Sequence, residues 1–131
     1  MKGGGCAPSH LVIQRSHTEP MELAKEVREG ITVIWIQGDI DGATAPQLRD
    51  FVVAEVSPNC RIFLDASQVE FMSSAGLRVL LVLYREINES HGAVVLFGVS
   101  NDIYDAMSAT GFLRHFVIVN TFEEGVKALR P

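Results

Sequence analysis

Four short stretches of the chain are mostly apolar, and segments between them carry apolar residues at helical spacing. The four apolar stretches are residues 31–37, 61–65, 93–98 and 117–119. Continuous apolar character is typical of strands covered on both faces, as in a parallel sheet. The apolar residues of 44–56 and 74–90 recur every three or four positions, which predicts helices. Strands that alternate with helices predict an α/β fold, with a mostly parallel central sheet of about 4–6 strands and about four helices packed on it.

The first 28 residues carry a weaker pattern. Residues 21–28 favour a first strand, and the apolar patch at 11–13 is either an extra edge strand or irregular. Three consecutive glycines and several polar residues surround that patch, which is typical of a flexible terminus. We therefore predict a flexible N-terminal tail over residues 1–20 and one folded domain over residues 21–131.

Capping residues precede several of the predicted helices. Thr44 and Gln47 match the capping box, and so do Thr121 and Glu124. In this motif the threonine oxygen accepts a hydrogen bond from the backbone N–H three residues later. Ser100 is expected to cap a further helix in the same way.

The helical spacing also predicts a core. Leu80 and Leu81 lie on the expected apolar face of the helix at 74–90. We expect both to be buried together with one residue from each of three apolar strands. These strand residues are Ile34, Leu64 and Val95.

Composition and charge narrow the possible functions. Apolar residues make up 47% of the chain and charged residues 21%, which is ordinary for a globular protein. No apolar run approaches the ~18 residues of a membrane span, and no signal-peptide core follows Lys2, so we expect a cytoplasmic protein without membrane contact. The net charge of −5 argues against direct nucleic-acid binding. Cys6 and Cys60 lack a metal-like spacing, so we expect no metal site.

Motifs for catalysis are missing. A nucleophile elbow needs a glycine two residues before its serine, but Met72 stands two residues before Ser74. The P-loop pattern is absent, and the four histidines show no recognisable spacing to a carboxylate or a cysteine. We therefore expect a protein that is not an enzyme and that needs no cofactor.

Two serines at the start of the helix at 74–90 are the candidate chemistry. Ser73 or Ser74 occupies the N-cap, where a hydroxyl accepts a hydrogen bond from an otherwise unpaired backbone N–H. The N-terminus of a helix favours negative charge, so a phosphate on either serine would be stabilised there. A capping role alone is also sufficient to explain these two residues.

The sequence FMSSAGLRVLL, preceded by LDASQVE, resembles the signature of the STAS domain and especially that of bacterial anti-sigma factor antagonists. When Phe71, Gly76 and Leu77 are aligned with that signature, the family's phosphorylated serine falls on Ser74. The family's preceding aspartate falls on Ser73. The stretch GDIDGATAPQL also resembles the family, and the resemblance extends over about residues 21–129.

The resemblance implies a STAS-like fold and a switchable interaction module. The unphosphorylated form is expected to bind an anti-sigma factor that is also a serine kinase, and thereby to release a sigma factor. Phosphorylation of Ser74, with Ser73 as the alternative, is expected to weaken the complex. A serine phosphatase of the same pathway would then reset the cycle.

The expected partner-binding surface combines the serine loop with the neighbouring loop at 39–44. Its residues are Asp39, Asp41, Thr44, Met72, Ser73, Gly76, Leu77 and Arg78. Loop solubility and turn hydrogen bonds explain the two aspartates equally well. Because Ser73 replaces the family's aspartate, the alternative is a STAS scaffold or ligand-binding module of a signalling or transport assembly that is not phosphorylated.

Overall fold

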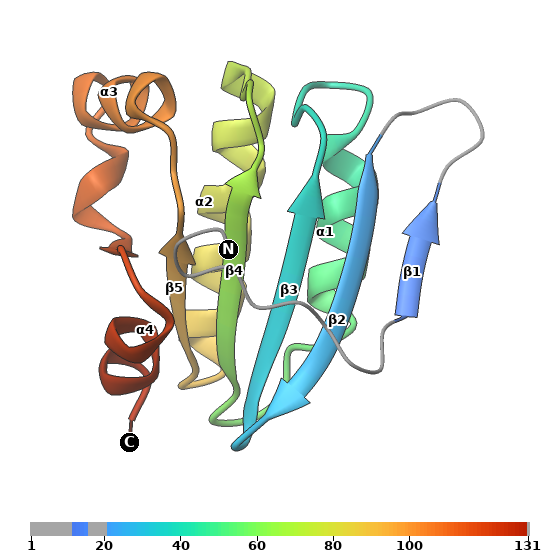
Figure 1. Cartoon of the computed structure of the whole chain (residues 1–131), viewed down its shortest axis with the longest axis vertical. Helices are drawn as coiled ribbons and strands as arrows, with labels where there is room; N and C mark the ends of the chain where they lie inside the picture. Colours follow the sequence, from blue (N-terminus) through green and yellow to red (C-terminus); the bar gives the residue numbers. More distant parts are fainter. Residues whose placement is uncertain (1–11, 16–20, 131) are drawn as a thin grey trace.

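A six-stranded sheet forms the centre of the protein (Figure 1). The computed structural model describes residues 12–15 and 21–130. The strands follow one another across the sheet in chain order, and the three pairs from β3 to β6 are parallel. β1 and β2 extend the sheet in antiparallel pairing. All four predicted apolar strands therefore share one mostly parallel sheet, as expected. The strands are β1 (Val12–Arg15), β2 (Glu22–Arg28), β3 (Ile31–Gln37), β4 (Arg61–Gln68), β5 (Ala93–Phe97) and β6 (Val117–Val119).

Helices lie on both faces of the sheet. α1 and α2 are seen behind the strands in Figure 1. Residues of α3 join α1 and α2 in one apolar cluster, whereas residues of α4 belong to a cluster on the other face. None of the helices in the described part of the chain is long and apolar enough to cross a membrane. The helices are α1 (Ala45–Val53), α2 (Ser74–Glu89), α3 (Asn101–Ala109), the 3-10 turn η1 (Phe112–Arg114) and α4 (Phe122–Ala128).

β1 settles one alternative in the N-terminal region. Val12–Arg15 pairs in antiparallel fashion with β2, so these four residues form the edge strand that was one of the two alternatives. The predicted first strand at 21–28 is also present, as β2. The rest of the predicted tail, residues 1–11 and 16–20, lies outside the described residues.

Of the three helix caps predicted at Thr44, Ser100 and Thr121, two are present and one is not. The Thr121 Oγ1 accepts from the Glu124 N–H at 3.0 Å, and the Ser100 Oγ accepts from the Ile103 N–H at 3.2 Å. Thr44 precedes α1, but its side chain makes no capping bond to that helix. The predicted capping box at Thr44 and Gln47 is therefore wrong, because the threonine hydroxyl bonds within its own loop instead.

The core consists of two clusters, because alternate residues of a strand point to opposite faces of the sheet. The helix-side cluster lies under α1, α2 and α3 and contains Ile34, Leu64 and Leu80, each at most 1% exposed. The α4-side cluster contains Phe63 and Val95 on the opposite face. The prediction that Ile34, Leu64 and Leu80 are buried together is confirmed.

Two members of the predicted core are placed differently. Val95 is 1% exposed but belongs to the α4-side cluster, because its neighbours Val94 and Leu96 take the helix-side positions of β5. Leu81 is only half-buried, whereas Leu83 is 1% exposed. The apolar stripe of α2 is therefore rotated relative to the predicted one.

Candidate partner-binding site

Two loops at the carboxyl ends of β3 and β4 are joined by backbone hydrogen bonds. The Ile40 N–H donates to the Phe71 carbonyl at 3.0 Å, and the Ser73 N–H donates to the Ile40 carbonyl at 2.9 Å. Ile40 and Met72 form an isolated parallel bridge between the loops. The carboxyl ends of adjacent parallel strands meet at one edge of a sheet, so two sequence motifs about 30 residues apart come together there.

Asp41 and Thr44 shape the first of these loops. The Asp41 Oδ1 accepts from the N–H groups of Ala43 and Thr44, at 2.9 and 3.1 Å. The Thr44 hydroxyl donates to the Asp39 carbonyl at 2.8 Å and accepts from the Asp41 N–H at 2.9 Å. Thr44 is 1% exposed. The Thr44 hydroxyl and the Asp41 Oδ1 atom, which belong to two predicted contact residues, form hydrogen bonds within the loop. Asp39 is exposed and remains available at the surface.

The two serines have different positions at the start of α2. Ser73 is the N-cap, and its Oγ accepts from the Gly76 N–H at 3.3 Å. Ser74 is the first helical residue and is exposed, and its hydroxyl has no hydrogen-bond partner within the described part of the chain. Modification of Ser74 would therefore leave the cap intact, whereas modification of Ser73 would disturb it.

The remaining predicted contact residues divide between the surface and the interior. Gly76 is buried, and Leu77 is 5% exposed and packs in the helix-side cluster. These two residues therefore lie beneath the surface of the site and not on it. Arg78 is exposed, and no residue in the described ranges forms an ion pair or hydrogen bond with its guanidinium group.

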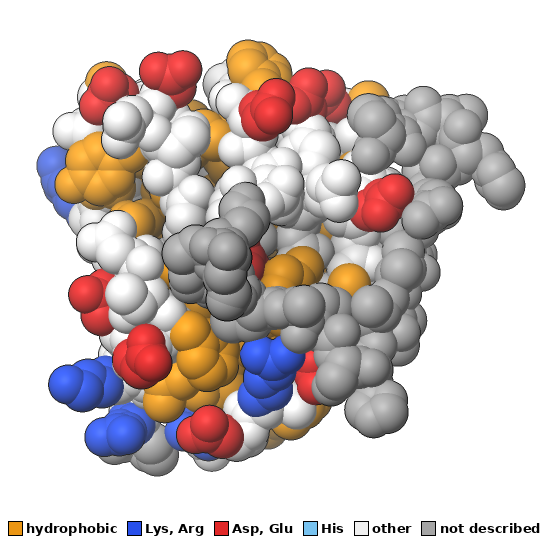
Figure 2. Space-filling view, in the orientation of Figure 1, with side chains coloured by type: hydrophobic (Ala, Val, Ile, Leu, Met, Phe, Trp, Pro, Cys, Tyr) orange, Lys and Arg blue, Asp and Glu red, His pale blue; other side chains and the backbone are white. Residues whose placement is uncertain are grey.

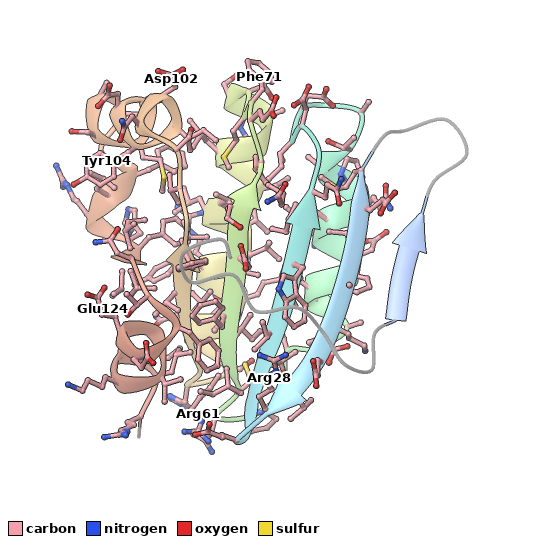
Figure 3. All side chains as sticks on the ribbon, viewed as in Figure 1. Arg28, Arg61, Phe71, Asp102, Tyr104 and Glu124 are labelled. Carbon is pink, nitrogen blue, oxygen red and sulfur yellow. The ribbon has the colours of Figure 1, made fainter. Side chains whose placement is uncertain are left out.

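Phe71, rather than Met72, is the exposed apolar side chain of the site. Phe71 is 52% exposed and projects from the loop at the upper edge of the molecule (Figure 3). Met72 is half-buried and packs against the helix-side cluster. Phe71 and Met72 are adjacent apolar residues of this loop, and the bridge between Ile40 and Met72 makes Met72 the one that turns inward.

The close approach of the two loops depends on the absence of a side chain at Gly76. A Cβ atom there would lie 2.7 Å from the Ile40 carbonyl oxygen and 2.8 Å from the Met72 Cγ. Real Cβ atoms essentially never approach other atoms this closely, so the backbone of the first loop would have to move. The two loops can therefore lie against each other only because residue 76 has no side chain.

Replacing Gly76 with alanine is expected to lower the free energy of unfolding by about 1–3 kcal/mol, the usual cost of overpacking. Helix propensity alone favours alanine by about 1 kcal/mol, so any loss reports the clash with Ile40 and Met72. Urea unfolding followed by circular dichroism measures the effect. Gly42→Ala is the matched control, because a Cβ at Gly42 meets no atom within 4 Å. A midpoint for Gly76→Ala at or above that of Gly42→Ala would contradict the expected loss.

A groove lies between α1 and α2 and is lined by Ala75, the residue that follows Ser74. We call it the α1–α2 groove. It has a volume of about 390 Å³, and its walls include Pro46 and Arg49 of α1 and Ala75, Arg78 and Val79 of α2. Sequence reasoning identified Arg78 but missed the groove, because the groove exists only where the two helices pack together.

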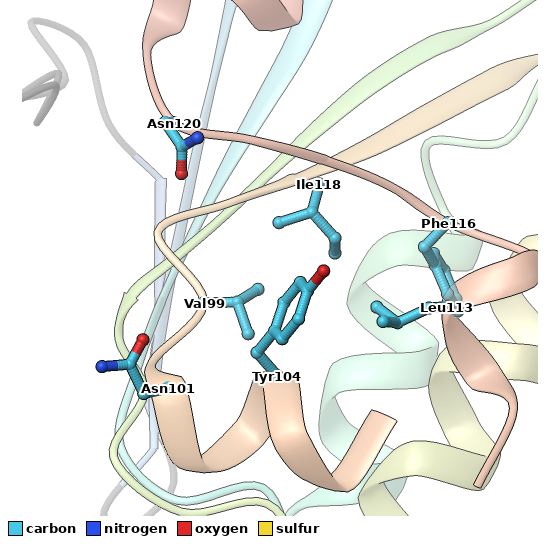
Figure 4. A pocket seen from close by; sticks show the side chains of 7 residues that line it. All are labelled: Val99, Asn101, Tyr104, Leu113, Phe116, Ile118 and Asn120. Carbon is cyan, nitrogen blue, oxygen red and sulfur yellow. The ribbon is translucent and has the colours of Figure 1, made fainter. Parts of the chain in front are cut away.

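A second hollow of about 530 Å³ lies between α3, η1 and β6. Figure 4 shows the Tyr104 ring among apolar side chains, with Asn101 and Asn120 farther out. The walls of the hollow come from the segment after β5, from α3, from η1 and from β6 with its flanking residues, and none of the predicted site residues lines it. It is therefore separate from the serine site.

The edge of the sheet that carries the site is acidic. In Figure 2, Asp and Glu side chains gather along the upper edge, where the parallel strands end. The exposed residues Asp39 and Glu70 come from the two loops themselves. Arg78 is thus a cation close to a surface that is otherwise rich in carboxylates.

Comparisons with known proteins agree with this fold. The sequence profile described as the STAS domain matches residues 22–125. BtrV of Bordetella bronchiseptica, named as a candidate anti-sigma factor antagonist, is 29% identical over 111 residues, which are 84% of this chain and 96% of that protein. The anti-sigma-B factor antagonist of Listeria monocytogenes is 28% identical over 95 residues, covering 70% and 83%. The crystal structure of an anti-sigma factor antagonist from Mycobacterium paratuberculosis is similar with a TM-score of 0.76 and 27% identity, covering 89% of this chain and 100% of that one.

Proposed function

This chain belongs to the STAS domain family, and we propose that it is an anti-sigma factor antagonist whose binding is switched by phosphorylation of Ser74. The names of the relatives described above support the first part of this proposal. The observation that carries the second part is the position of Ser74, exposed and without a hydrogen-bond partner in the described chain, directly after the capping residue Ser73.

In the proposed cycle, the unphosphorylated protein binds an anti-sigma factor that is also a serine kinase, and a sigma factor is released. The kinase then transfers a phosphate from ATP to the Ser74 hydroxyl, and the complex weakens. A serine phosphatase hydrolyses the phosphate ester and restores the binding form. The protein itself acts in the cytoplasm as a binding partner and performs no catalysis.

The physical basis of the switch is local electrostatics. A phosphate adds a charge of about −1.5 to −2 and must be desolvated if it lies inside an interface. The site already carries the carboxylates of Asp39 and Glu70, so the added charge increases repulsion towards acidic groups of the partner. The helix N-terminus stabilises the anion, so the domain is expected to keep its fold while its binding changes.

Ser74 is preferred to Ser73 as the acceptor because of the hydrogen bonds around them. The Ser73 Oγ accepts from the Gly76 N–H, so a phosphate on Ser73 would disturb the start of α2. Loss of such a cap usually costs about 0.5–2 kcal/mol. The Ser74 hydroxyl can be modified without that cost.

Incubation with the cognate anti-sigma factor kinase and ATP is expected to add one phosphate to the protein, on Ser74. Ser74→Ala should abolish labelling but still bind the kinase, because a smaller side chain leaves the surface intact. Ser74→Glu should weaken binding less than the phosphate does, since a carboxylate carries one charge. Mass spectrometry of the labelled peptide and calorimetric titration measure the two effects.

Ser73→Ala is the matched control for this experiment. It should lose stability through the missing cap but still accept phosphate on Ser74. Phosphate found on Ser73 would refute the residue assignment. The absence of phosphate from both serines, together with binding to an unrelated partner, would instead favour a STAS scaffold or ligand-binding module that is not phosphorylated.

A further inference from the structure

Arg78 lies close both to the α1–α2 groove and to Ser74, so it can pair with a group of the partner or with a phosphate on Ser74. It borders the α1–α2 groove and follows Ser74 by four residues on α2. We propose that the α1–α2 groove docks an apolar segment of the anti-sigma factor with a carboxylate that pairs with Arg78. A phosphate on Ser74 then withdraws Arg78 from that carboxylate. This inference rests on the proposed function.

The first step is helix geometry. Residues four apart on a helix are neighbours, with Cβ atoms about 5–6 Å apart. Helical side chains lean towards the N-terminus, so the Arg78 side chain covers the turn that contains Ser74. An acidic group placed four residues before a basic one is the more favourable order of such a pair. A guanidinium group also matches a phosphate with two parallel hydrogen bonds.

The second step is the charge balance of the groove. Arg49 on the α1 wall already has a partner, because its Nη2 donates to Glu86 Oε2 of α2 at 3.2 Å. Arg78 on the α2 wall has no such partner within the described part of the chain. Asp50 also lines the groove, but neither arginine forms an ion pair with it. The unmatched cation next to Ser74 is therefore Arg78.

The third step is the chemistry of the occupant. Ala45, Pro46, Ala75 and Val79 give the groove an apolar lining. A segment that buries an apolar side chain there and presents a carboxylate to Arg78 complements both features. Phosphorylated Ser74 competes for the same guanidinium group from within the same helix, so the partner's carboxylate loses its counter-charge and faces a phosphate instead.

The intramolecular half of the proposal is tested without any partner. Phosphoserine is incorporated at position 74 by genetic encoding, and its second ionisation, ordinarily near pH 6, is followed by ³¹P NMR. The midpoint is expected to lie about half a pH unit lower in the protein with Arg78 than in Arg78→Gln, because the cation favours the dianion. Arg85→Gln, an exposed arginine on the same helix and farther from Ser74, should behave like the protein with Arg78. Equal midpoints for all three proteins would overturn the inference.

The intermolecular half uses the anti-sigma factor kinase of the phosphorylation experiment as the probe. Arg78→Gln is expected to weaken binding about tenfold, the usual scale for a partly desolvated charge pair. Ser74→Glu should then weaken binding much less in the Arg78→Gln background than in the unaltered protein, because the shared group is gone. Arg78→Lys should restore part of the affinity, and Arg85→Gln should leave it unchanged.

Two outcomes would overturn the docking arrangement. One is unchanged affinity in Arg78→Gln, and the other is a double variant whose loss equals the product of the two single losses. Neither outcome affects the proposed function, which fails if Ser74 is not phosphorylated or if no anti-sigma factor binds. The ³¹P titration remains readable in that case, so the two failures are distinguishable.

Discussion

Replacing Phe63 with alanine is expected to lower the free energy of unfolding by about 3–5 kcal/mol, a large share of the total stability of a small domain. Phe63 is 0% exposed and lies in the α4-side cluster. Its ring packs against Phe97 of β5 and Phe122 of α4, with ring centroids 5.6 and 5.2 Å apart. Truncation would leave a cavity between the sheet and α4 that this short helix cannot fill.

Gly125 makes this cavity especially costly. A Cβ atom at Gly125 would overlap the Phe63 ring, so the backbone of α4 rests directly on that ring. Removal of the ring therefore takes away both apolar contacts and the surface on which α4 sits. We expect α4 to unfold at a lower urea concentration than the rest of the domain, which hydrogen exchange of its backbone amides would detect.

Phe71→Ala is the matched control for Phe63→Ala. Both variants remove the same side chain, but Phe71 is 52% exposed and makes no core contact. We expect its free energy of unfolding to change by about 0.5 kcal/mol or less. Urea titration with extrapolation to zero denaturant compares the two proteins. Similar losses in both variants would contradict the assignment of Phe63 to the core.

Leu83→Ala is expected to lower the free energy of unfolding by about 2–5 kcal/mol, the range for a packed leucine. Leu83 is 1% exposed and lies in the helix-side cluster, where α2 covers the sheet. The loss includes the apolar transfer free energy of the deleted atoms and the cavity they leave. The same urea titration measures it.

Leu81→Ala is the control for this prediction, because it makes the same change two residues earlier on the same helix. Leu81 is half-buried, so we expect a loss of about 1 kcal/mol or less. The helix propensity change is identical in the two variants and cancels in the comparison. A larger loss in Leu81→Ala than in Leu83→Ala would mean that the apolar stripe of α2 is the one the sequence spacing predicted.

The misplacement of Leu81 shows a limit of periodicity. Residues 79–84 are apolar almost without interruption, so several stripes on α2 fit the helical spacing equally well. The packing of α2 against α1 and the sheet selects the stripe that contains Leu80 and Leu83. When a helix has apolar residues on several sides, its own sequence does not specify which side faces the sheet.

The position of Val95 shows the same limit for strands. β5 is apolar at every position, which correctly predicts a buried strand. Such a strand lacks the alternation that tells one face from the other. The pairing of β5 with β4, with Val95 opposite Phe63, assigns both residues to the α4-side cluster.

The site divides in a similar way. Local chemistry identified the start of α2 and its serines, because capping depends on neighbours in sequence. The choice of Ser73 as the cap depends on the path of the chain into the helix, which the hydrogen bond from the Ser73 N–H to Ile40 fixes. The interior role of Thr44, the exposure of Phe71 and the α1–α2 groove likewise depend on contacts between segments distant in sequence.

The amino-acid sequence by itself determined the α/β class, the four apolar strands, the helix starts at Ser100 and Thr121, and the motif around Ser74. These features depend on the order of apolar and polar residues over a few positions, where backbone geometry and nearby hydrogen bonds dominate the free energy. Only the tertiary structure decided which face each apolar residue covers, which serine caps α2, and which side chains border Ser74. Those choices come from packing between elements that are far apart in the chain, and such packing has no signature within either element alone.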